Sequence, residues 1–377
     1  MKIGFDAKRF FHNNSGLGNY SRSLIHSLLR YYPDNDYFLY TPSYQQDNKT
    51  GFINDFANAT VKTPSNLFSK TFKSSWRSLR MAAQVRKDHI DLYHGLSHEL
   101  PYNIQRSNAK SIVTIHDLIF MRYPQYYNYF DRKIYKTKFQ YSCDVSNKII
   151  AVSAQTKNDI VEFLNGDANK IEVIPPSIHS IFTKEISEAE KNSVKNKYNL
   201  PSEFLLYVST VEPRKNLVTL IKATHQLKSD IPLVIVGKHT HYIDNVNSII
   251  ENEKPENKFI FIENADFIDL PAIYSLATLF IYPSLFEGFG LPVVEAMFCK
   301  TPVITSNTSC LPEAGGDAAM YVNPTNAEEM SSAISTLLND SALRNTMVAK
   351  GITHAQQFTE ENTAHKMASL YKSVYGQ

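Results

Sequence analysis

The sequence predicts an α/β protein made of two doubly wound domains, each a parallel sheet with helices on both faces. Short runs of β-branched and aromatic residues alternate with amphipathic stretches along most of the chain. This alternation stops at a polar, proline-containing break and then starts again. The length of 377 residues also exceeds what one hydrophobic core usually organises. We therefore expect two domains that face each other across a cleft.

The first half contains five predicted strands separated by longer amphipathic segments. The strands are expected at Lys2–Phe5, Tyr37–Tyr40, Leu92–His94, Ser111–Ile115 and Lys148–Val152. Amphipathic helices are expected between several of them, at Asn19–Tyr31 and Leu67–Lys87. Strands that alternate with helices favour parallel pairing, and helices then cover both faces of the sheet.

The second half repeats this pattern after the break at Val173–Leu200. Its predicted strands are Leu205–Ser209, Leu233–Gly237, Phe259–Ile262, Leu279–Tyr282 and Val303–Thr305, and its predicted helices are Asn216–Leu227, Leu270–Leu276 and Ala327–Leu338. We expect domains at 1–180 and 181–357, with a closing helix at Phe358–Tyr375. That helix, within 358–377, is a candidate to join the first domain. Ligands are expected at the carboxyl ends of both sheets.

Composition excludes several classes of protein. The net charge of +2 is too small for a nucleic-acid-binding protein. The three cysteines have no ligand-like spacing, which favours buried thiols in a reducing compartment. The charged start and the absence of a run of about 18 apolar residues argue against a signal peptide and a membrane-spanning helix. The expected location is cytoplasmic.

The loop after the strand at Leu279–Tyr282 has the clearest chemical pattern. Residues 284–297 read SLFEGFGLPVVEAM. Gly288 and Gly290 permit a tight turn and a close approach of ligand to backbone, and Pro292 suits the first turn of a helix. The N–H groups at the start of such a helix form a natural seat for phosphate oxygens, which we expect at Gly290–Val293.

Two carboxylates and two cations are expected beside this seat. Glu287 lies in the loop and Glu295 about one turn into the helix. A glycosidase pair would flank one bond and would not need an anion seat, so hydrogen bonds from sugar and ribose hydroxyls suit these glutamates better. The alternative is a surface charge at Glu287 and a helix-dipole partner at Glu295. Arg214 and Lys215 follow another strand of the same half and can bind phosphate oxygens.

These segments together resemble a known enzyme family. The run EPRKNL at 212–217, the SLFEGFGLPVVEAM loop and TPVITSNTSCLPEAGGDAAMYVNP at 301–324 are similar to retaining glycosyltransferases with two Rossmann-like domains, the GT-B type. A Glu, seven residues and a second Glu resemble family 4 of the sequence-based classification, the glycosyl transferases group 1, and its mannosyltransferases. GLGNYS at 16–21, IHD at 115–117 and AVSAQTKNDI at 151–160 match more loosely.

The resemblance implies roles for the residues of the second half. Arg214 and Lys215 would hold the diphosphate of a nucleotide-sugar donor, such as GDP-mannose or a UDP-sugar. Glu287 would contact hydroxyls of the transferred sugar, and Glu295 would contact the ribose. The sugar–diphosphate region would be lined by Gly288, Phe289, Gly290 and Leu291. The chain departs from the family in having Ser209-Thr210 where many members have a glycine and a basic residue, and in Ile174–Ser177, which replaces an IPNG-like segment.

The first half is expected to supply the opposite wall of the cleft. Gly16, Gly18 and Asn19 open a helix, with Asn19 as a candidate cap. A dinucleotide fingerprint would need a third glycine where Ser21 stands, so no redox cofactor is expected. These three residues are instead expected near the acceptor and the diphosphate. His116 and Asp117 end a strand and are candidates to bind the transferred sugar, with a packing role as the alternative for His116.

Two further expectations concern metals and membranes. None of the twelve histidines pairs with an acid at metal-ligand spacing, so neither a metal nor a cofactor is expected. Leu67–Lys87 combines an aromatic face with several lysines and arginines. It is a hypothetical peripheral contact with the inner membrane face or with a lipid-linked acceptor, and the alternative is an ordinary domain helix.

The sequence therefore predicts a metal-independent, retaining hexosyltransferase, with mannose as the first choice of sugar. The acceptor would be a hydroxyl of a glycan or of a lipid-linked intermediate in the synthesis of cell-surface polysaccharide or lipopolysaccharide. The alternatives are a glycan phosphorylase or a nucleotide-sugar epimerase of the same architecture, or a non-catalytic nucleotide-sugar-binding protein.

Overall fold

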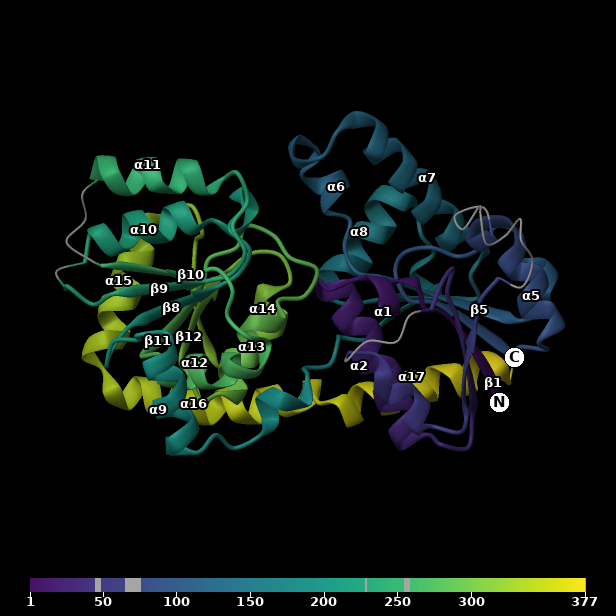
Figure 1. Cartoon of the computed structure of the whole chain (residues 1–377). Coiled ribbons are helices and arrows are strands. Elements are labelled where there is room, and N and C mark those ends of the chain that lie inside the picture. Colours follow the sequence, from purple (N-terminus) through teal and green to yellow (C-terminus); the bar gives the residue numbers. More distant parts are fainter. Residues whose placement is uncertain (45–48, 65–75, 228, 254–257, 377) are drawn as a thin grey trace. The chain divides into compact units, whose positions relative to one another are not determined.

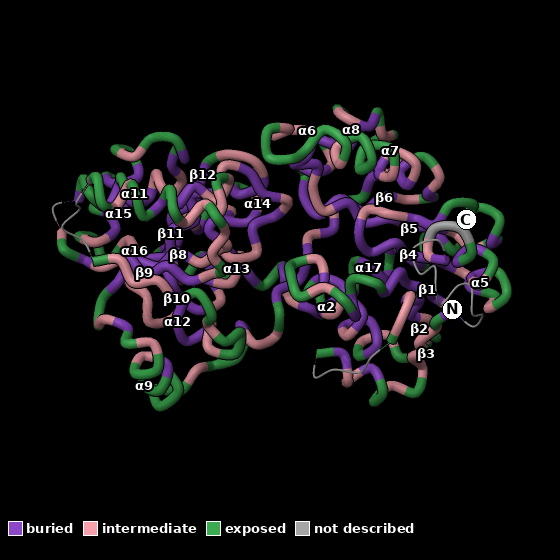
Figure 2. The backbone as a smooth tube through the Cα atoms, turned by 45° about the horizontal axis from the view of Figure 1, so that its top comes forward, coloured by how far each residue is buried: buried purple, intermediate pink, exposed green. Residues whose placement is uncertain are grey.

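The computed structural model describes residues 1–44, 49–64, 76–227, 229–253 and 258–376. It divides into two compact units, of which unit 1 comprises Met1–Ser177 and Glu360–Gln377, and unit 2 comprises Ile178–Thr359. Figure 1 shows that each unit is a sheet covered by helices. In Figure 2 the strands are mainly buried and the outer faces of the helices are exposed. The predicted fold class is confirmed, since each unit is a doubly wound parallel sheet.

The sheet of unit 1 has the order β3-β2-β1-β4-β5-β6-β7, and every neighbouring pair is parallel. The strands are β1 (Lys2–Asp6), β2 (Asp36–Tyr40), β3 (Ala59–Lys62), β4 (Leu92–Gly95), β5 (Lys110–Ile115), β6 (Lys148–Ala151) and β7 (Ile171–Val173). The sequence prediction missed β3 and β7, the two edge strands.

Helices cover both faces of this sheet because successive strand residues point to opposite sides. They are α1 (Lys8–His12), α2 (Gly16–Tyr31), α5 (Met81–Lys87), α6 (Ile119–Arg122), α7 (Tyr129–Val145), α8 (Ala154–Leu164) and α17 (Glu360–Tyr375). Ile112 of β5 packs in the hydrophobic cluster that contains α2 and α17. The next residue, Val113, packs in the cluster that contains α5, α7 and α8.

The C-terminal helix α17 is part of the core of unit 1. It packs along α2 and buries Met367 and Tyr371. The hydroxyl of Tyr371 lies 2.6 Å from Nδ1 of His94 at the end of β4. This buried hydrogen bond ties the last helix to the middle of the sheet.

The helix predicted at Leu67–Lys87 lies partly outside the described residues, which resume at Trp76. Trp76–Arg80 form one π-helical turn, and α5 follows. Trp76 is buried. Arg77 forms salt bridges with Asp6 at 2.6 Å and with Glu99 at 2.8 Å. Within the described part, Arg77 therefore binds carboxylates of its own unit, in contrast to the basic surface that the sequence suggested.

The sheet of unit 2 has the order β10-β9-β8-β11-β12-β13 and is also parallel. Its strands are β8 (Leu205–Val208), β9 (Leu233–Val236), β10 (Phe259–Ile262), β11 (Leu279–Tyr282), β12 (Val303–Ser306) and β13 (Ala319–Val322), of which β13 was not predicted. The helices are α9 (Glu188–Lys197), α10 (Leu217–His225), α11 (Ile243–Glu253), α12 (Leu270–Leu276), α13 (Leu291–Phe298), α14 (Leu311–Gly315), α15 (Ala327–Asn339) and α16 (Ser341–Ala355). Figure 1 shows α10 and α11 over one face and α9 and α12 over the other.

The strand order of unit 2 reverses between β8 and β11, which are hydrogen-bonded neighbours. Loops that leave two such strands at their carboxyl ends diverge to opposite faces and open a crevice, the usual place for a ligand in this kind of sheet. The corresponding point in unit 1 lies between β1 and β4.

Candidate active site

The carboxyl ends of β8 and β11 bring together two segments that lie far apart in the sequence. Arg214 and Lys215 follow β8 in a short 3₁₀ turn (Pro213–Lys215), and Glu287 lies in the loop between β11 and α13. The backbone N–H of Leu285 donates to the carbonyl of Arg214 at 2.9 Å, which fixes the two loops against each other. Adjacent strands, and not local sequence, therefore place these side chains side by side.

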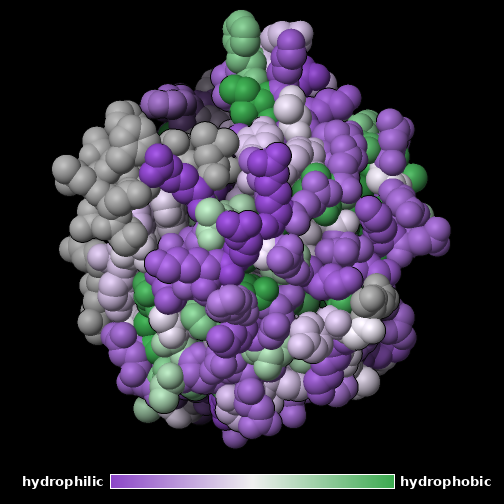
Figure 3. Space-filling view, turned by 90° about the vertical axis from the view of Figure 1, so that its right-hand side faces the viewer, coloured by the Kyte–Doolittle hydropathy of each residue, from purple (hydrophilic) through white to green (hydrophobic). Residues whose placement is uncertain are grey.

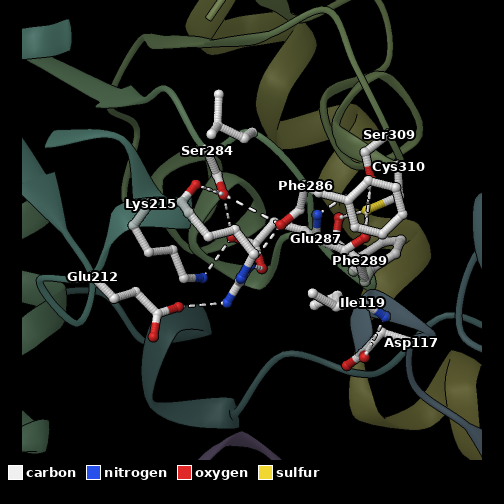
Figure 4. A network of polar contacts seen from close by, with 12 residues as sticks. Asp117, Ile119, Glu212, Lys215, Ser284, Phe286, Glu287, Phe289, Ser309 and Cys310 are labelled. Atoms are coloured by element: carbon white, nitrogen blue, oxygen red, sulfur yellow. Dashed lines mark hydrogen bonds and ion pairs between the residues drawn. The ribbon is translucent and has the colours of Figure 1, made fainter. Parts of the chain in front are cut away.

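Glu287 is held between both predicted phosphate-binding cations (Figure 4). Its Oε1 lies 2.5 Å from Nζ of Lys215, and its Oε2 lies 2.9 Å from Nη1 of Arg214. Arg214 also binds the carboxylate of Glu212 at 2.6 Å and donates to the carbonyl of Phe286. Two positive and two negative charges thus form one compact, electrically balanced cluster.

Two hydroxyl groups complete the surroundings of the Glu287 carboxylate. Ser284 donates to Oε1 at 2.6 Å and Tyr282 donates to the same oxygen at 2.9 Å. Lys215 also donates to the hydroxyl of Tyr282 at 2.8 Å, so the lysine, the tyrosine and the glutamate contact one another. Tyr282 and Ser284 were not predicted as site residues, although both lie within five residues of Glu287.

The carboxylate of Glu287 is ionised throughout the physiological range. Only 8% of the residue is exposed. Burial alone would raise the pKa, but the charges of Lys215 and Arg214 and the hydrogen bonds outweigh this and lower the pKa of Glu287 to about 2. A permanently charged, buried group of this kind acts as an acceptor of hydrogen bonds and as a counter-ion.

The backbone of Glu287 is fixed from the start of α14. The hydroxyl of Ser309 donates to the carbonyl of Glu287 at 2.9 Å and accepts from its N–H at 3.2 Å. The thiol of Cys310 lies 3.2 Å from the same carbonyl and 3.0 Å from that of Phe289. Cys310 is fully buried and burial raises its thiol pKa well above the usual value, so it serves as a packing and hydrogen-bonding residue. The sequence analysis missed this role as well.

The start of α13 supports a narrower anion seat than the sequence suggested. Gly290 caps the helix with a φ of 104°, a conformation that favours glycine. A Cβ atom at this position would also lie 2.7 Å from the side chain of Leu311. Pro292 has no N–H, and the N–H of Val293 donates to the carbonyl of Gly290 at 3.0 Å. We predicted that phosphate binds the N–H groups of Gly290–Val293. Of these groups, those of Gly290 and Leu291 remain candidates.

Glu295 lies apart from the charged cluster, on the first turns of α13. Its Oε2 accepts a hydrogen bond from the hydroxyl of Tyr274 on α12 at 2.9 Å. Burial raises the pKa of Glu295 to about 7, because the single hydrogen bond from Tyr274 does not compensate for the lost hydration. The two glutamates of the motif thus have opposite electrostatic environments.

Asn216 joins the loops at the carboxyl edge of the sheet of unit 2. Its side-chain N–H₂ donates to the carbonyls of Pro283 at 3.0 Å and of Pro324 at 2.6 Å. Its side-chain oxygen accepts from Thr219 at 2.6 Å. Its backbone φ of 58° also suits asparagine. The asparagine of the EPRKNL run is therefore a structural residue that positions the preceding Arg-Lys pair.

In unit 1, the glycine segment opens α2 as predicted, but Asn19 is not its cap. The helix begins at Gly16 with Ser15 at the cap position. The side-chain oxygen of Asn13 accepts from the N–H groups of Ser15 at 2.9 Å and Gly18 at 3.1 Å. Asn19 lies inside the helix, where its side chain accepts from Arg22. The capping prediction was wrong because the loop before the helix folds back and supplies Asn13.

The two glycines at the start of α2 have different structural requirements. A Cβ atom on Gly18 would lie 1.9 Å from the carbonyl oxygen of Asn13, so only glycine fits this close approach. A Cβ atom on Gly16 would meet nothing within 4 Å. The requirement for glycine at position 18 is thus explained by packing within unit 1.

His116 lies in a group of aromatic rings after β5. Its Nε2 lies 2.8 Å from the carbonyl of Leu96, and its ring packs edge-on against Tyr20 and His98. Burial lowers the pKa of His116 to about 3, and the nearby His98 acts in the same direction. His116 is therefore a neutral imidazole whose Nε2–H donates to Leu96. Asp117 accepts from the N–H of Ile119 at 3.1 Å and turns the chain into α6 (Figure 4).

His94, on β4, is a core residue. It is completely buried, with Nδ1 against Tyr371 and Nε2 2.8 Å from the hydroxyl of Thr114. Burial lowers its pKa to about 3. His98, which the sequence analysis did not single out, stacks on Phe139 with 4.4 Å between ring centroids. Three neutral histidines thus occupy the carboxyl ends of β4 and β5.

The described residues lack two kinds of feature. No group of three histidine, cysteine, aspartate or glutamate side chains in that part of the chain has the arrangement of a metal site. None of the helices there combines the length and the apolar character needed to cross a membrane.

The chain matches two known sequence families, one in each half. Residues 188–354 match the family described as Glycosyl transferases group 1, and residues 15–180 match Glycosyltransferase Family 4.

Several similar proteins are bacterial mannosyltransferases. O-antigen chain mannosyltransferase B of Escherichia coli is 32% identical, and the match covers 78% of this chain and 77% of the relative. O-antigen chain mannosyltransferase RfbU of Salmonella typhimurium is 31% identical over 74% of this chain and 76% of that protein. The serotype-specific mannosyltransferase WbdA of Escherichia coli is 30% identical over 73% of this chain, but the match covers only 35% of that relative.

Solved structures share the fold over nearly the whole chain. Sucrose-phosphate synthase of Thermosynechococcus elongatus has a TM-score of 0.77 at 21% identity, with 100% of this chain and 99% of that chain covered. Anabaena Alr3699/HepE, solved in complex with UDP and glucose, has a TM-score of 0.75 at 17% identity, with 99% and 100% covered. At these identities the likeness is one of fold, the GT-B fold with two Rossmann-like domains.

Proposed function

The chain belongs to the group 1 glycosyltransferases, and from this premise we propose that it transfers a mannosyl unit from a nucleotide diphosphate donor, with retention of configuration. The acceptor is a hydroxyl of a glycan or of a lipid-linked intermediate in the synthesis of a cell-surface polysaccharide such as an O-antigen. The names of its mannosyltransferase relatives support the choice of mannose. GDP-mannose is the first choice of donor and a UDP-sugar the second.

One observation carries this proposal, the pairing of Arg214 and Lys215 with Glu287 at the reversal point of the sheet. The cations are already positioned beside one another, and their present partner is a carboxylate. A diphosphate carries the same kind of charged oxygen, so it can take over these contacts with little rearrangement. The N–H groups of Gly290 and Leu291 at the start of α13 would complete the diphosphate site.

Glu287 then has two successive tasks. Without donor it neutralises Arg214 and Lys215, and with donor bound it accepts hydrogen bonds from hydroxyls of the transferred sugar. Glu295, which lies further along α13, accepts from the ribose hydroxyls. Phe289 and Gly288 supply backbone to the sugar–diphosphate region.

We propose that unit 1 contacts the transferred sugar and the acceptor with groups that bind hydroxyls. His116, with a pKa lowered to about 3, is neutral at neutral pH, and because its Nε2–H donates to Leu96, its Nδ1 can accept a hydrogen bond from a hydroxyl. Asp117 and the Gly16–Asn19 segment are assigned to the same side of the reaction. Hydrogen-bond acceptors of this kind suit hydroxyl groups, whereas the cations of unit 2 suit phosphate.

The proposed chemical step needs neither a metal nor a cofactor. The acceptor hydroxyl attacks the anomeric carbon on the face from which the diphosphate departs. The bond from that carbon to the phosphate oxygen breaks, and the hydroxyl proton passes to the departing phosphate. Arg214, Lys215 and the start of α13 stabilise the charge that develops on the leaving group. We place the reaction in the cytoplasm, at the inner membrane face when the acceptor is lipid-linked.

The test is transfer by the purified protein from a panel of nucleotide sugars to mannosylated acceptors, with and without a metal chelator. We expect transfer from GDP-mannose, no effect of the chelator, and a product whose anomeric configuration, read by NMR, matches that of the donor. An inverted product would contradict the retaining mechanism. Phosphate-dependent cleavage of a glycan, or conversion of the donor without an acceptor, would favour a phosphorylase or an epimerase instead.

A further inference from the structure

An exposed cluster of aromatic and aliphatic side chains lies where α6 leads into α7. Phe130, Tyr129 and Ile134 are 76%, 67% and 51% exposed. These residues, together with three neighbouring tyrosines, form what we call the α7 patch: Tyr126, Tyr127, Tyr129, Phe130, Ile134 and Tyr135. A group of large hydrophobic residues exposed together on one segment usually marks an interaction surface.

The α7 patch is built on a fixed support. The ring of Phe120 packs edge-on against those of Tyr127 and Tyr135, with 6.4 and 5.7 Å between centroids. Phe120 in turn packs against Phe139, and both are buried. Asn128 caps α7 by accepting from the N–H of Asp131 at 2.8 Å. The exposed side chains are thus presented from an ordered helix start whose other side is core.

Two exposed lysines lie among the exposed hydrophobic residues on the first turns of α7. They are Lys133 and Lys136. At 100° per residue, Lys133 falls between Tyr129 and Phe130, whereas Lys136 falls beside Tyr129 and away from Phe130. Neither forms a salt bridge in the part of the chain that the structure describes. Nearby Arg122 and Lys138, by contrast, bind Asp159 and Glu99.

The side chains at the top of the molecule agree with this description. Figure 3 shows hydrophobic side chains that project there among hydrophilic ones, at the level where Figure 1 draws the start of α7. The surface is therefore not a hollow that would enclose a small ligand. The α7 patch projects outward, as side chains that insert into a lipid bilayer must do.

We propose that the α7 patch docks the protein on the surface of an anionic lipid bilayer. Tyrosine is enriched at the membrane–water interface, phenylalanine is typical of the apolar face that inserts into it, and exposed lysines beside them attract anionic headgroups. A glycan would stack on the aromatic rings of the α7 patch. Its binding would not need two lysines that lack salt-bridge partners. This inference concerns a different surface from 67–87, and it does not depend on the identity of the donor or the sugar.

The test measures binding of the purified full chain to vesicles. Wild-type protein is expected to co-sediment with vesicles containing phosphatidylglycerol and to bind much less to pure phosphatidylcholine. Substitution of Phe130 and Ile134 together by serine should weaken binding by about tenfold or more, because the inserted apolar area is lost. The double variant K133E/K136E should weaken binding at low salt and be nearly indifferent to added salt.

Matched controls lie on α17, far from the patch in sequence and equally exposed. Tyr375→Ser and Lys366→Glu should bind vesicles as the wild type does. Circular dichroism should show that all variants are folded, since the changed side chains are exposed. Transfer to a water-soluble acceptor should be unchanged in the patch variants, which separates docking from catalysis.

Three results would overturn the proposal. The first is no binding of wild-type protein to anionic vesicles at low salt. The second is equal binding by wild type, F130S/I134S and K133E/K136E. The third is a raised KM for a soluble glycan acceptor in F130S/I134S without any change in vesicle binding, which would assign the α7 patch to the acceptor instead. Failure of transfer in all proteins, with vesicle binding intact, would contradict only the proposed function.

Discussion

The carboxyl edges of the two sheets occupy equivalent positions in two similar folds, yet their chemistry differs. In unit 2 the edge carries a buried cluster of full charges, in which Arg214 and Lys215 pair with Glu287. In unit 1 the edge carries uncharged histidines, of which His94 and His116 have pKa values lowered to about 3. Both edges are buried. The edge of unit 1 also has an ion-pair cluster, in which Arg77 binds Asp6 and Glu99, whereas its buried histidines are neutral.

This contrast shows how one architecture can hold two kinds of buried polar group. Burial removes charge unless a partner of opposite sign is present. Where partners are present, as around Glu287, the groups stay ionised and can form ion pairs with a charged ligand. Where they are absent, as around His116, the groups stay neutral and suit hydroxyl groups. The comparison makes specific predictions, because each edge should respond differently to mutation and to pH.

The largest expected effect comes from removing a cation from the edge of unit 2. Arg214→Ala should lower kcat/KM by about a thousandfold, because the arginine would stabilise the charge that develops on the leaving diphosphate. Steady-state transfer kinetics with GDP-mannose measure this. The matched control is Lys222→Ala on α10, an exposed cation of the same unit, which should retain full activity. Equal activity of the two variants would mean that the charged cluster does not bind the donor.

The second effect separates the two tasks assigned to Glu287. Glu287→Gln should lower transfer by about a hundredfold, because the amide no longer accepts as a full charge. The same variant should bind free GDP about tenfold more tightly, since the diphosphate no longer has to displace a carboxylate from Arg214 and Lys215. Isothermal titration calorimetry measures the affinity.

A control for this substitution is Glu212→Gln. Glu212 pairs with Arg214 but is more exposed than Glu287, so the variant should change GDP affinity only slightly. Weaker GDP binding by Glu287→Gln than by wild type would show that Glu287 holds the cations in place and does not compete with phosphate.

Much of the fold could be predicted from the sequence, and the misses have a common physical cause. Central strands such as β11 and β12 are buried on both faces and read as continuous apolar runs. The missed strands β3, β7 and β13 lie at sheet edges and are only partly buried. Each has only three or four residues, and β3 and β7 include polar ones, so their patterns are too short to distinguish from a loop.

The candidate site could be predicted only as a set of residues, not as a network. The carboxyl-end rule placed Arg214, Lys215 and Glu287 at one edge, but their direct pairing depends on β8 lying beside β11. Ser309 and Cys310 reach Glu287 from the segment after β12, which pairs with β11 on its other side, whereas Tyr282 lies on β11 itself. Nor could the cap of α2 be predicted, because Asn13 reaches it from a loop that folds back. Contacts of this kind have no local sequence pattern.

The third prediction uses pH to distinguish the units. A histidine whose pKa falls from 6.5 to about 3 on folding binds fewer protons in the folded state. Its stabilising contribution is therefore complete above pH 6.5 and is lost as the pH falls below that value. Between pH 7.5 and 5, one such histidine costs unit 1 about 2 kcal/mol.

Unit 2 should not lose stability over the same range. Glu287, with a pKa of about 2, remains ionised, and its contribution is lost only as the pH falls below about 4.5. Glu295, with a pKa raised to about 7, acts in the opposite direction and favours the folded state as the pH falls through 7. Hydrogen exchange, corrected for intrinsic rates, should show loss of protection in β4 and β5 but not in β8 and β11.

Two variants test the assignment of this pH dependence to buried histidines. His94→Gln should reduce the pH dependence of protection in unit 1, although it also lowers stability at pH 7.5 because it disturbs the contacts with Tyr371 and Thr114. His89→Asn changes an exposed histidine of the same unit whose positive φ also suits asparagine, and it should leave the profile unchanged. Parallel loss of protection in both units would indicate that the units unfold together.

The smallest effect concerns Glu295 of unit 2, whose pKa lies near neutral. Its pKa of about 7 means that the side chain is largely protonated at pH 6 and largely ionised at pH 8. An ionised carboxylate accepts hydrogen bonds from two ribose hydroxyls better than the protonated acid does. The KM for GDP-mannose should therefore fall several-fold from pH 6 to pH 8 in wild-type protein, and Glu295→Gln should abolish this dependence while keeping the higher KM. If KM depended on pH to a similar extent in both proteins, a group other than Glu295 would be responsible, and the assignment of Glu295 to the ribose would lose its support.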